Sequence, residues 1–150
     1  MTPTTERSAS TPARYEGQAL LENEGEIFER IESLAEAIRY KNVDHVMSHY
    51  APDVLAFDVQ PPLEVRGVAA YRKNFEKWFA SMAGRIAFEM SGVHISADDN
   101  HAYSHCLSHV TGARTGGGRA DYWVRITSAW RKMHGEWVVA HEHISMPTML

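Results

Sequence analysis

The chain lacks several features that would place it in particular classes of protein. Its 150 residues include one cysteine, Cys106, so no disulfide can form within the chain, and a cytoplasmic location is the simpler expectation. No apolar run is long enough to span a membrane, and the first 17 residues lack the apolar stretch of a secretory signal. Fifteen Lys and Arg against 19 Asp and Glu give a net charge of −4, which argues against a nucleic-acid partner.

The glycine positions and the composition indicate a single domain without a phosphate-binding loop. Gly116–Gly118 joins two predicted strands rather than opening a helix, so it indicates a hairpin and not a phosphate-binding loop. A hydrophobic content of 44% in 150 residues is enough for one domain with its own core. We expect residues 1–25 to be a flexible N-terminal extension, although 15–26 could extend the next helix, and 26–150 to form the domain.

Three helices are predicted before the chain turns to strands. Apolar residues recur at helical spacing over 26–41, and Asn42 should end that helix. Asp44 can cap a second, short helix, HVMSHY, which ends before Pro52. A third helix over 68–82 carries an apolar stripe of Tyr71, Phe75, Trp78, Phe79 and Met82.

The remaining segments have the alternation and the turn residues of strands. Helices followed by a long antiparallel meander predict an α+β domain, in which the helices pack on one face of a curved sheet. The predicted strands are 54–59, 63–66, 85–96, 101–112, 120–132 and 136–145.

The most informative stretch for chemistry is DVLAFDVQPPLEVRG, from Asp53 to Gly67. It carries Asp58 to the end of an apolar strand, immediately before the Pro61-Pro62 turn. A carboxylate partly withdrawn from water at the wall of a pocket can act as a general base. Alternatively, Asp58 caps the turn or pairs with Arg66 or Arg72.

The order of elements and three segments resemble the nuclear transport factor 2-like (NTF2-like) superfamily, and more closely its SnoaL-like and ketosteroid isomerase-like branches. The segments are IESLAEAIRYKNVDHVMSHYAPDVLAFD, PPLEVRG and WRKMHGEWVVAHEHISMP, and the resemblance covers about 27–147. It implies a cone-shaped α+β barrel with a ligand cavity at its open end, usually in a homodimer that pairs through the outer sheet faces. Members of the superfamily range from isomerases, cyclases and dehydratases to proteins without catalysis, so the fold does not select an activity.

The resemblance to ketosteroid isomerases can be carried over residue by residue. Their catalytic Asp corresponds to Asp58, nine residues before Gly67. Their oxyanion-binding tyrosine and second acid correspond, in gap-free counting, to Leu34 and Thr127, neither of which is as strong a hydrogen-bond donor. The resemblance therefore implies a retained base and a lost or rebuilt oxyanion hole.

The last two strands offer further polar candidates, because side chains alternate along a strand. His141 and His143 share one face and could contact a ligand or a neighbouring strand; a metal site with His105 or His109 is the weaker alternative, so we expect no metal and no cofactor. On the preceding strand, Trp123, Arg125 and Thr127 share a face.

Register decides which of these sets faces the cavity. If residue 131 pairs with 136, Arg125 lies opposite Glu142. The two residues then lie either inside the cone, where Arg125 could bind a ligand, or outside, as an ion pair on the surface. A one-residue slip would instead place the two histidines inside.

A third set lies on the strand 101–112. Tyr103, His105, Leu107 and His109 share one face, and His105 could serve as an acid or as a partner of Asp58. Cys106, on the other face, is interpreted as a small buried hydrophobic residue. Trp78 could form an apolar floor for a small ligand.

Two functional hypotheses follow. The first is a cofactor-free isomerase, cyclase or hydratase that acts on a small, mostly apolar molecule, with Asp58 as base and with Arg125, His105 or a C-terminal histidine stabilising the oxyanion. The second is a non-catalytic ligand-binding or dimerisation module with a vestigial pocket.

Overall fold

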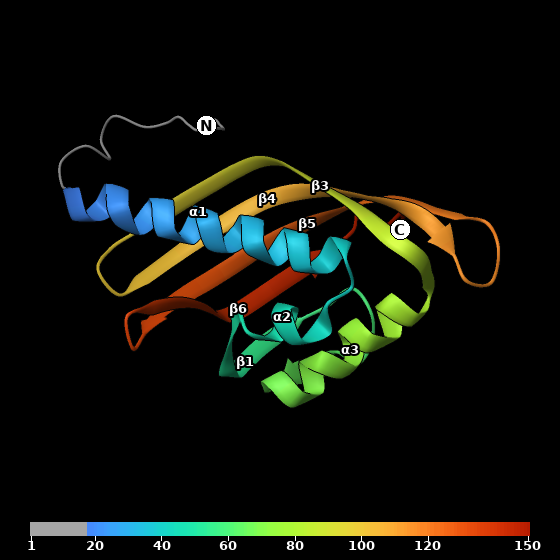
Figure 1. The fold of residues 1–150 in the computed structure, drawn as a ribbon, viewed down its shortest axis with the longest axis horizontal. Coiled ribbons are helices and arrows are strands. Elements are labelled where there is room, and N and C mark those ends of the chain that lie inside the picture. Colours follow the sequence, from blue (N-terminus) through green and yellow to red (C-terminus); the bar gives the residue numbers. More distant parts are fainter. Residues whose placement is uncertain (1–17) are drawn as a thin grey trace.

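The computed structural model describes residues 18–150, which form three helices and one six-stranded sheet (Figure 1). Of the extension predicted over 1–25, residues 1–17 lie outside the described residues. The elements in chain order are α1 (Gln18–Arg39), α2 (Val43–Met47), β1 (Tyr50–Phe57), β2 (Val65–Arg66), α3 (Val68–Ala80), β3 (Met82–Ala97), β4 (His101–Arg114), β5 (Arg119–Met133) and β6 (Glu136–Ser145).

The predicted α+β class is confirmed. The strand order is β2-β1-β6-β5-β4-β3, so the sheet is curved but not closed, and α1 lies across one of its faces (Figure 1). None of the described helices is long and apolar enough to cross a membrane.

The first helix follows its apolar periodicity. Ile27, Ile31, Ala35 and Ile38 are buried against the sheet, as their spacing predicts. The helix begins at Gln18, so the segment left open in the sequence extends it toward the N-terminus.

The predicted cap of the second helix is wrong. Asn42, not Asp44, is the N-cap residue of α2, and its side-chain oxygen accepts a hydrogen bond from the backbone N–H of His45 at 3.1 Å. Asp44 lies two positions further on and pairs with Arg72 of α3. The short helix therefore begins earlier than expected and ends at Met47, which leaves Tyr50 free to start β1.

The pairing of β1 with β6 brings distant parts of the chain together. It is the parallel pair in an otherwise antiparallel sheet, with Tyr50 beside Val139 and Ala56 beside Glu142. The helices then lie on the concave side of the sheet (Figure 1), and the Tyr71 hydroxyl of α3 donates a hydrogen bond to Glu142 of β6.

Of the registers left open for the last two strands, the one that pairs residue 131 with 136 does not form, because Arg131 pairs with Val138. Met133 pairs with Glu136, and a register shift lies between Ala129 and Trp130. Ser128 is therefore the partner of Glu142, and Arg125 pairs with Ser145. Because of this offset, Arg125 and Glu142 lie on opposite faces of the sheet, and neither proposed Arg–Glu pair forms.

Candidate ligand site

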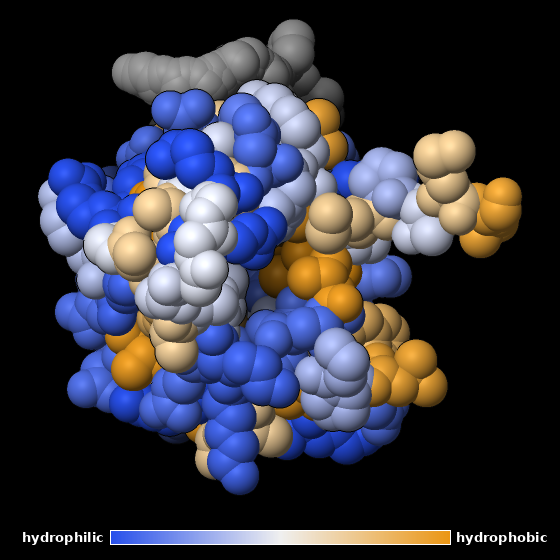
Figure 2. Space-filling view, turned by 90° about the vertical axis from the view of Figure 1, so that its right-hand side faces the viewer, coloured by the Kyte–Doolittle hydropathy of each residue, from blue (hydrophilic) through white to orange (hydrophobic). Residues whose placement is uncertain are grey.

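A cavity of about 360 Å³ lies between the helices and the concave face of the sheet. This volume is near the lower end of the range for small-molecule sites, roughly 300–1,000 Å³. Figure 2 shows apolar residues gathered around a hollow on one face of the molecule. Most of the lining is apolar, including Ile31, Leu34, Phe75, Trp78, Phe88, Met90 and Val124.

Asp58 lies at the wall of this cavity, just beyond the end of β1. Its Oδ2 accepts hydrogen bonds from Asn74 Nδ2 at 2.8 Å and from Gln60 Nε2 at 3.3 Å, and its Oδ1 accepts one from the Val59 N–H at 2.8 Å. The predicted pairs with Arg66 and Arg72 do not form, because these arginines pair with Glu64, and with Asp44 and Glu76. Three N–H donors thus orient the carboxylate, and Oδ1 keeps a lone pair that can accept a proton.

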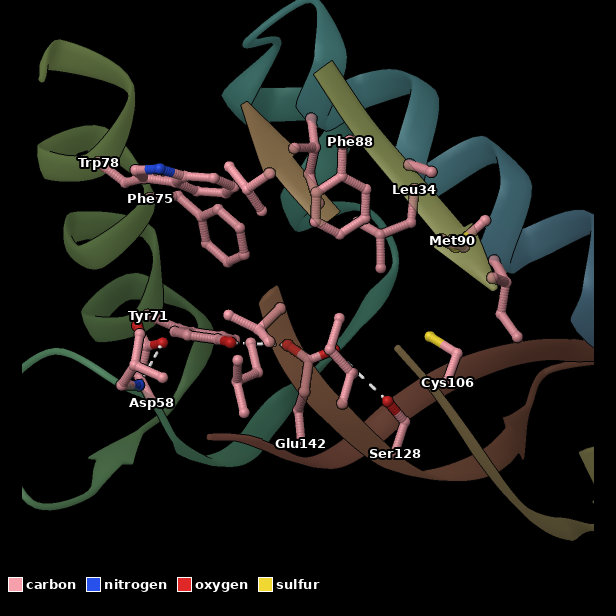
Figure 3. A pocket seen from close by; sticks show the side chains of 18 of the residues that line it. Leu34, Asp58, Tyr71, Phe75, Trp78, Phe88, Met90, Cys106, Ser128 and Glu142 are labelled. Atoms are coloured by element: carbon pink, nitrogen blue, oxygen red, sulfur yellow. Dashed lines mark hydrogen bonds between the residues drawn. The ribbon is translucent and has the colours of Figure 1, made fainter. Parts of the chain in front are cut away.

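A second acid, Glu142 of β6, lies inside the same cavity and is 3% exposed (Figure 3). Its Oε1 accepts hydrogen bonds from the hydroxyls of Tyr71 at 2.6 Å and Tyr50 at 2.7 Å. Its Oε2 has one longer contact, with the Ser128 hydroxyl at 3.5 Å. The carboxyl group of Glu142 is therefore contacted by side chains from β1, α3 and β5.

The electrostatics of this cluster favour its neutral forms. Burial raises the pKa of Glu142, and the negative charge of Asp58 raises it further, against the hydrogen bonds from the two tyrosines, which lower it. Burial also raises the pKa of Tyr50 and of Tyr71 well above their usual range, so both hydroxyls keep their protons.

The cavity wall also contains the indole N–H of Trp78 and the thiol of Cys106. The indole N–H of Trp78 is buried in the wall near the hydroxyl of Tyr122; burial raises the pKa of Tyr122, and the hydrogen bond with Trp78 lowers it. Burial raises the pKa of the Cys106 thiol to about 11, which makes it a poor nucleophile near neutral pH. This agrees with its interpretation as a hydrophobic residue.

The structure separates the sequence-predicted histidines from Asp58. His105 borders the cavity, but its exposed ring stacks on His94, with 4.9 Å between the ring centroids. His141 donates a hydrogen bond from Nδ1 to the Leu55 carbonyl oxygen at 2.7 Å, and His143 is exposed beside Phe57. Among the residues 18–150, no cluster of three metal-ligating side chains forms.

Four other candidates lie on the outer face of the sheet. Tyr103 and Trp123 are about half exposed, and Arg125 and Thr127 are exposed; none of the four lines the cavity. Arg125 donates a hydrogen bond to Ser145 at 3.0 Å. Of the predicted site residues, Asp58, Trp78 and His105 therefore line the cavity, the last with its ring stacked on His94.

Sequence reasoning missed Tyr50 and Tyr71 as site residues and considered Glu142 only as a partner of Arg125. A partial signal was present in Tyr71, because a tyrosine in an apolar helical stripe normally needs a partner for its hydroxyl. Glu142 gave no comparable signal, since its inward direction depends on the register shift in β5–β6.

The comparisons with known proteins agree with this architecture. A family model described as the SnoaL-like domain matches residues 27–149. An NTF2-like protein of unknown function from Pseudomonas putida KT2440 is similar in structure, with a TM-score of 0.79 and 27% identity over 87% of this chain and 90% of that one. No curated protein matches the chain.

Two more distant structures are similar in fold. One is described as a candidate dehydratase of the NTF2-like family from Streptomyces avermitilis (TM-score 0.74, 15% identity, 85% of this chain and 98% of that one). The other is a candidate scytalone dehydratase from Novosphingobium aromaticivorans DSM 12444 (TM-score 0.75, 14% identity, 85% and 86%).

Proposed function

The chain belongs to the SnoaL-like domain family, and from this premise we propose that it binds a small, mostly apolar molecule in the cavity and abstracts a proton from it with Asp58, without a cofactor. The observation that supports this most is the carboxylate of Asp58 at the wall of an apolar cavity, held by three N–H donors. The reaction class is that of an isomerase, cyclase or hydratase.

The proposed step uses the free lone pair of Asp58 Oδ1. A C–H bond next to a carbonyl breaks, the proton moves to the carboxylate, and the electron pair of that bond becomes the C=C bond of an enolate. In an isomerase the same proton returns to another carbon. In a dehydratase the enolate re-forms the C=O bond and its C=C pair moves to form a new C=C bond to the neighbouring carbon, whose hydroxyl leaves with the C–O electron pair and takes the proton from Asp58 to become water. The apolar lining favours this step because it excludes water from the reacting carbon.

Ligand binding is tested with 2-acetylnaphthalene, an apolar bicyclic ketone. We expect it to raise the melting temperature of the protein, because a ligand that binds only the folded state stabilises it. Leu34→Trp should weaken this binding at least tenfold by filling the cavity, whereas Leu63→Trp should not, because Leu63 is 96% exposed and outside the lining. Equal binding by all three proteins, measured by calorimetry, would contradict the proposed ligand site.

The second candidate function is a non-catalytic ligand-binding module. It is favoured by the identities of Leu34 and Thr127, which stand where related isomerases have their oxyanion donors, and by the position of Thr127 on the outer face. The two candidates share the cavity and differ in whether Asp58 moves a proton.

We also propose that the protein is a cytoplasmic homodimer that pairs through the outer face of β3–β6. Large apolar side chains are exposed there: Tyr103 (49%), Leu107 (47%) and Trp123 (50%), the last stacked on His109 with 4.6 Å between ring centroids. A second copy would bury these side chains, and an exposed apolar patch of this kind is typical of an interface.

Light scattering after size exclusion tests the dimer. We expect twice the chain mass for the wild type and the chain mass for Trp123→Glu, because an unpaired carboxylate in an apolar interface is strongly disfavoured. Leu63→Glu, at a more exposed apolar residue away from this face, should remain dimeric. A monomeric wild type would rule the dimer out.

A further inference from the structure

The two oxygens of Glu142 are in very different situations. Oε1 accepts two short hydrogen bonds, from Tyr50 and Tyr71, and a carboxyl oxygen has two lone pairs in its plane. Oε1 is therefore saturated. Within residues 18–150, Oε2 has in contrast only the 3.5 Å contact with Ser128, which is too long for a strong hydrogen bond.

This asymmetry determines where a proton on Glu142 would be. Both tyrosines keep their protons and act as donors, so Oε1 must be the acceptor and the carbonyl oxygen of a neutral carboxylic acid. The acidic hydrogen is then on Oε2. Burial raises the pKa of Glu142, and the charge of nearby Asp58 acts in the same direction.

A buried hydroxyl without a good partner is costly unless a ligand provides one. The complementary ligand group accepts a hydrogen bond but has no hydrogen to donate, as in a ketone or aldehyde. Across the cavity from Glu142 the lining is apolar and includes Phe75, Phe88 and Met90 (Figure 3). Such a wall suits the hydrocarbon part of the same molecule.

We propose that Glu142 is a second functional group of the cavity, which donates a hydrogen bond from Oε2 to the carbonyl oxygen of an apolar ketone or aldehyde. Tyr50 and Tyr71 are positioning residues that fix which oxygen carries the hydrogen. The inference rests on the proposed function only in taking the cavity as the ligand site, and it requires no turnover.

The placement of the two acids gives them complementary tasks. In Figure 3, Asp58 and Glu142 lie along the same side of the cavity, with Tyr71 between them. Asp58 is accessible at the wall and Glu142 is buried, so one acid is placed to accept a proton and the other to polarise the carbonyl. Such a hydrogen bond strengthens as negative charge develops on the carbonyl oxygen.

Three probes of matched shape test this: 2-acetylnaphthalene, 1-(2-naphthyl)ethanol and 2-ethylnaphthalene, a ketone, an alcohol and a hydrocarbon. We compare their dissociation constants by calorimetry in the wild type, Glu142→Gln and Glu142→Leu. The ratio of ketone to hydrocarbon affinity should be about tenfold higher in the wild type than in Glu142→Leu, the effect of one buried hydrogen bond. Glu142→Gln should keep most of the preference, because its amide N–H₂ can occupy the Oε2 position.

The carbonyl stretching frequency of the bound ketone gives a readout that a purely structural role of Glu142 would not change. In the wild type and in Glu142→Gln we expect the infrared band to lie below its position in a hydrocarbon solvent. If Glu142→Leu does not fold, the wild type and Glu142→Gln still decide the matter through this band and through the ranking of the three probes.

Each other outcome overturns the inference in a recognisable way. Tightest binding of the alcohol with exclusion of the ketone would show that Glu142 is an ionised acceptor. Equal ketone preference in all three proteins, or an unshifted carbonyl band, would show that Glu142 does not contact the ligand, with the proposed function intact. If none of the probes binds, the proposed function itself fails and the inference fails with it.

Discussion

Replacing Asp58 with Asn should lower the rate of proton–deuterium exchange at the carbon next to the carbonyl of 2-tetralone by about 10²–10⁴-fold, the usual contribution of a general base. The amide of Asn keeps the size of the side chain but cannot accept the proton at neutral pH. The exchange is followed by proton NMR in D₂O, where a proton taken by Asp58 is replaced by deuterium before it returns to carbon. No knowledge of the natural substrate is needed.

The design includes two comparisons. Asp53→Asn is the matched control, because Asp53 also lies on β1 but is exposed and pairs with Arg131 away from the cavity, so we expect exchange at the wild-type rate. Asn74→Leu removes one of the two donors to Oδ2 and should reduce the rate less than Asp58→Asn does. If Asp58→Asn exchanges as fast as the wild type, or if the wild type does not exceed buffer, Asp58 is not a base and the non-catalytic module is favoured.

Local patterns predicted most of the fold. The apolar stripe of α1 and the turn residues between β3, β4, β5 and β6 are encoded within short windows of sequence, and the structure has helices and strands there. The position of Asp58 was predictable for the same reason, since a strand end and the Pro61-Pro62 turn fix it locally. The sequence therefore predicted the helices and strands that short windows encode. The predicted ends of these elements differ from the observed ends by a few residues.

The buried acid was not predictable because its cause is not local. Alternation gives the two faces of β6, but the register shift at Ala129/Trp130 and the parallel pairing with β1 decide which neighbours Glu142 has. Tyr50 and Tyr71 are 92 and 71 residues away from it in the chain. A prediction that relied on a regular hairpin register therefore put Arg125 opposite Glu142.

The acid stability of the protein should depend strongly on His49, a buried histidine outside the cavity. Burial lowers its pKa from 6.5 to about 4, and the charge of Arg30 acts in the same direction. Both nitrogens of the neutral ring have hydrogen-bond partners. Nδ1 donates to the His45 carbonyl oxygen at 2.8 Å, and Nε2 lies 3.0 Å from the Ser33 hydroxyl. Protonation would add a charge in a site built for the neutral form.

The sign of the effect follows from which state binds the proton. Between pH 6.5 and 4 the unfolded chain protonates His49 and the folded protein does not, so the free energy of unfolding falls as the pH falls. The stabilisation is complete above pH 6.5 and is lost down to pH 4, by about 3 kcal/mol in total for a shift of this size. Glu142 acts oppositely: its raised pKa makes its contribution decrease as the pH rises.

Urea unfolding at a series of pH values between 4 and 7 measures how the free energy of unfolding depends on pH. Comparison of variants separates the contribution of His49 to this dependence from that of Glu142. His49→Gln cannot take up the proton, so its free energy of unfolding should change by about 3 kcal/mol less than that of the wild type over the same range. His101→Gln is the matched control at an exposed position and should follow the wild-type curve. Parallel curves for the wild type and His49→Gln would mean that His49 is already accessible to protons in the folded protein, and that the contact between α1 and α2 opens well before global unfolding.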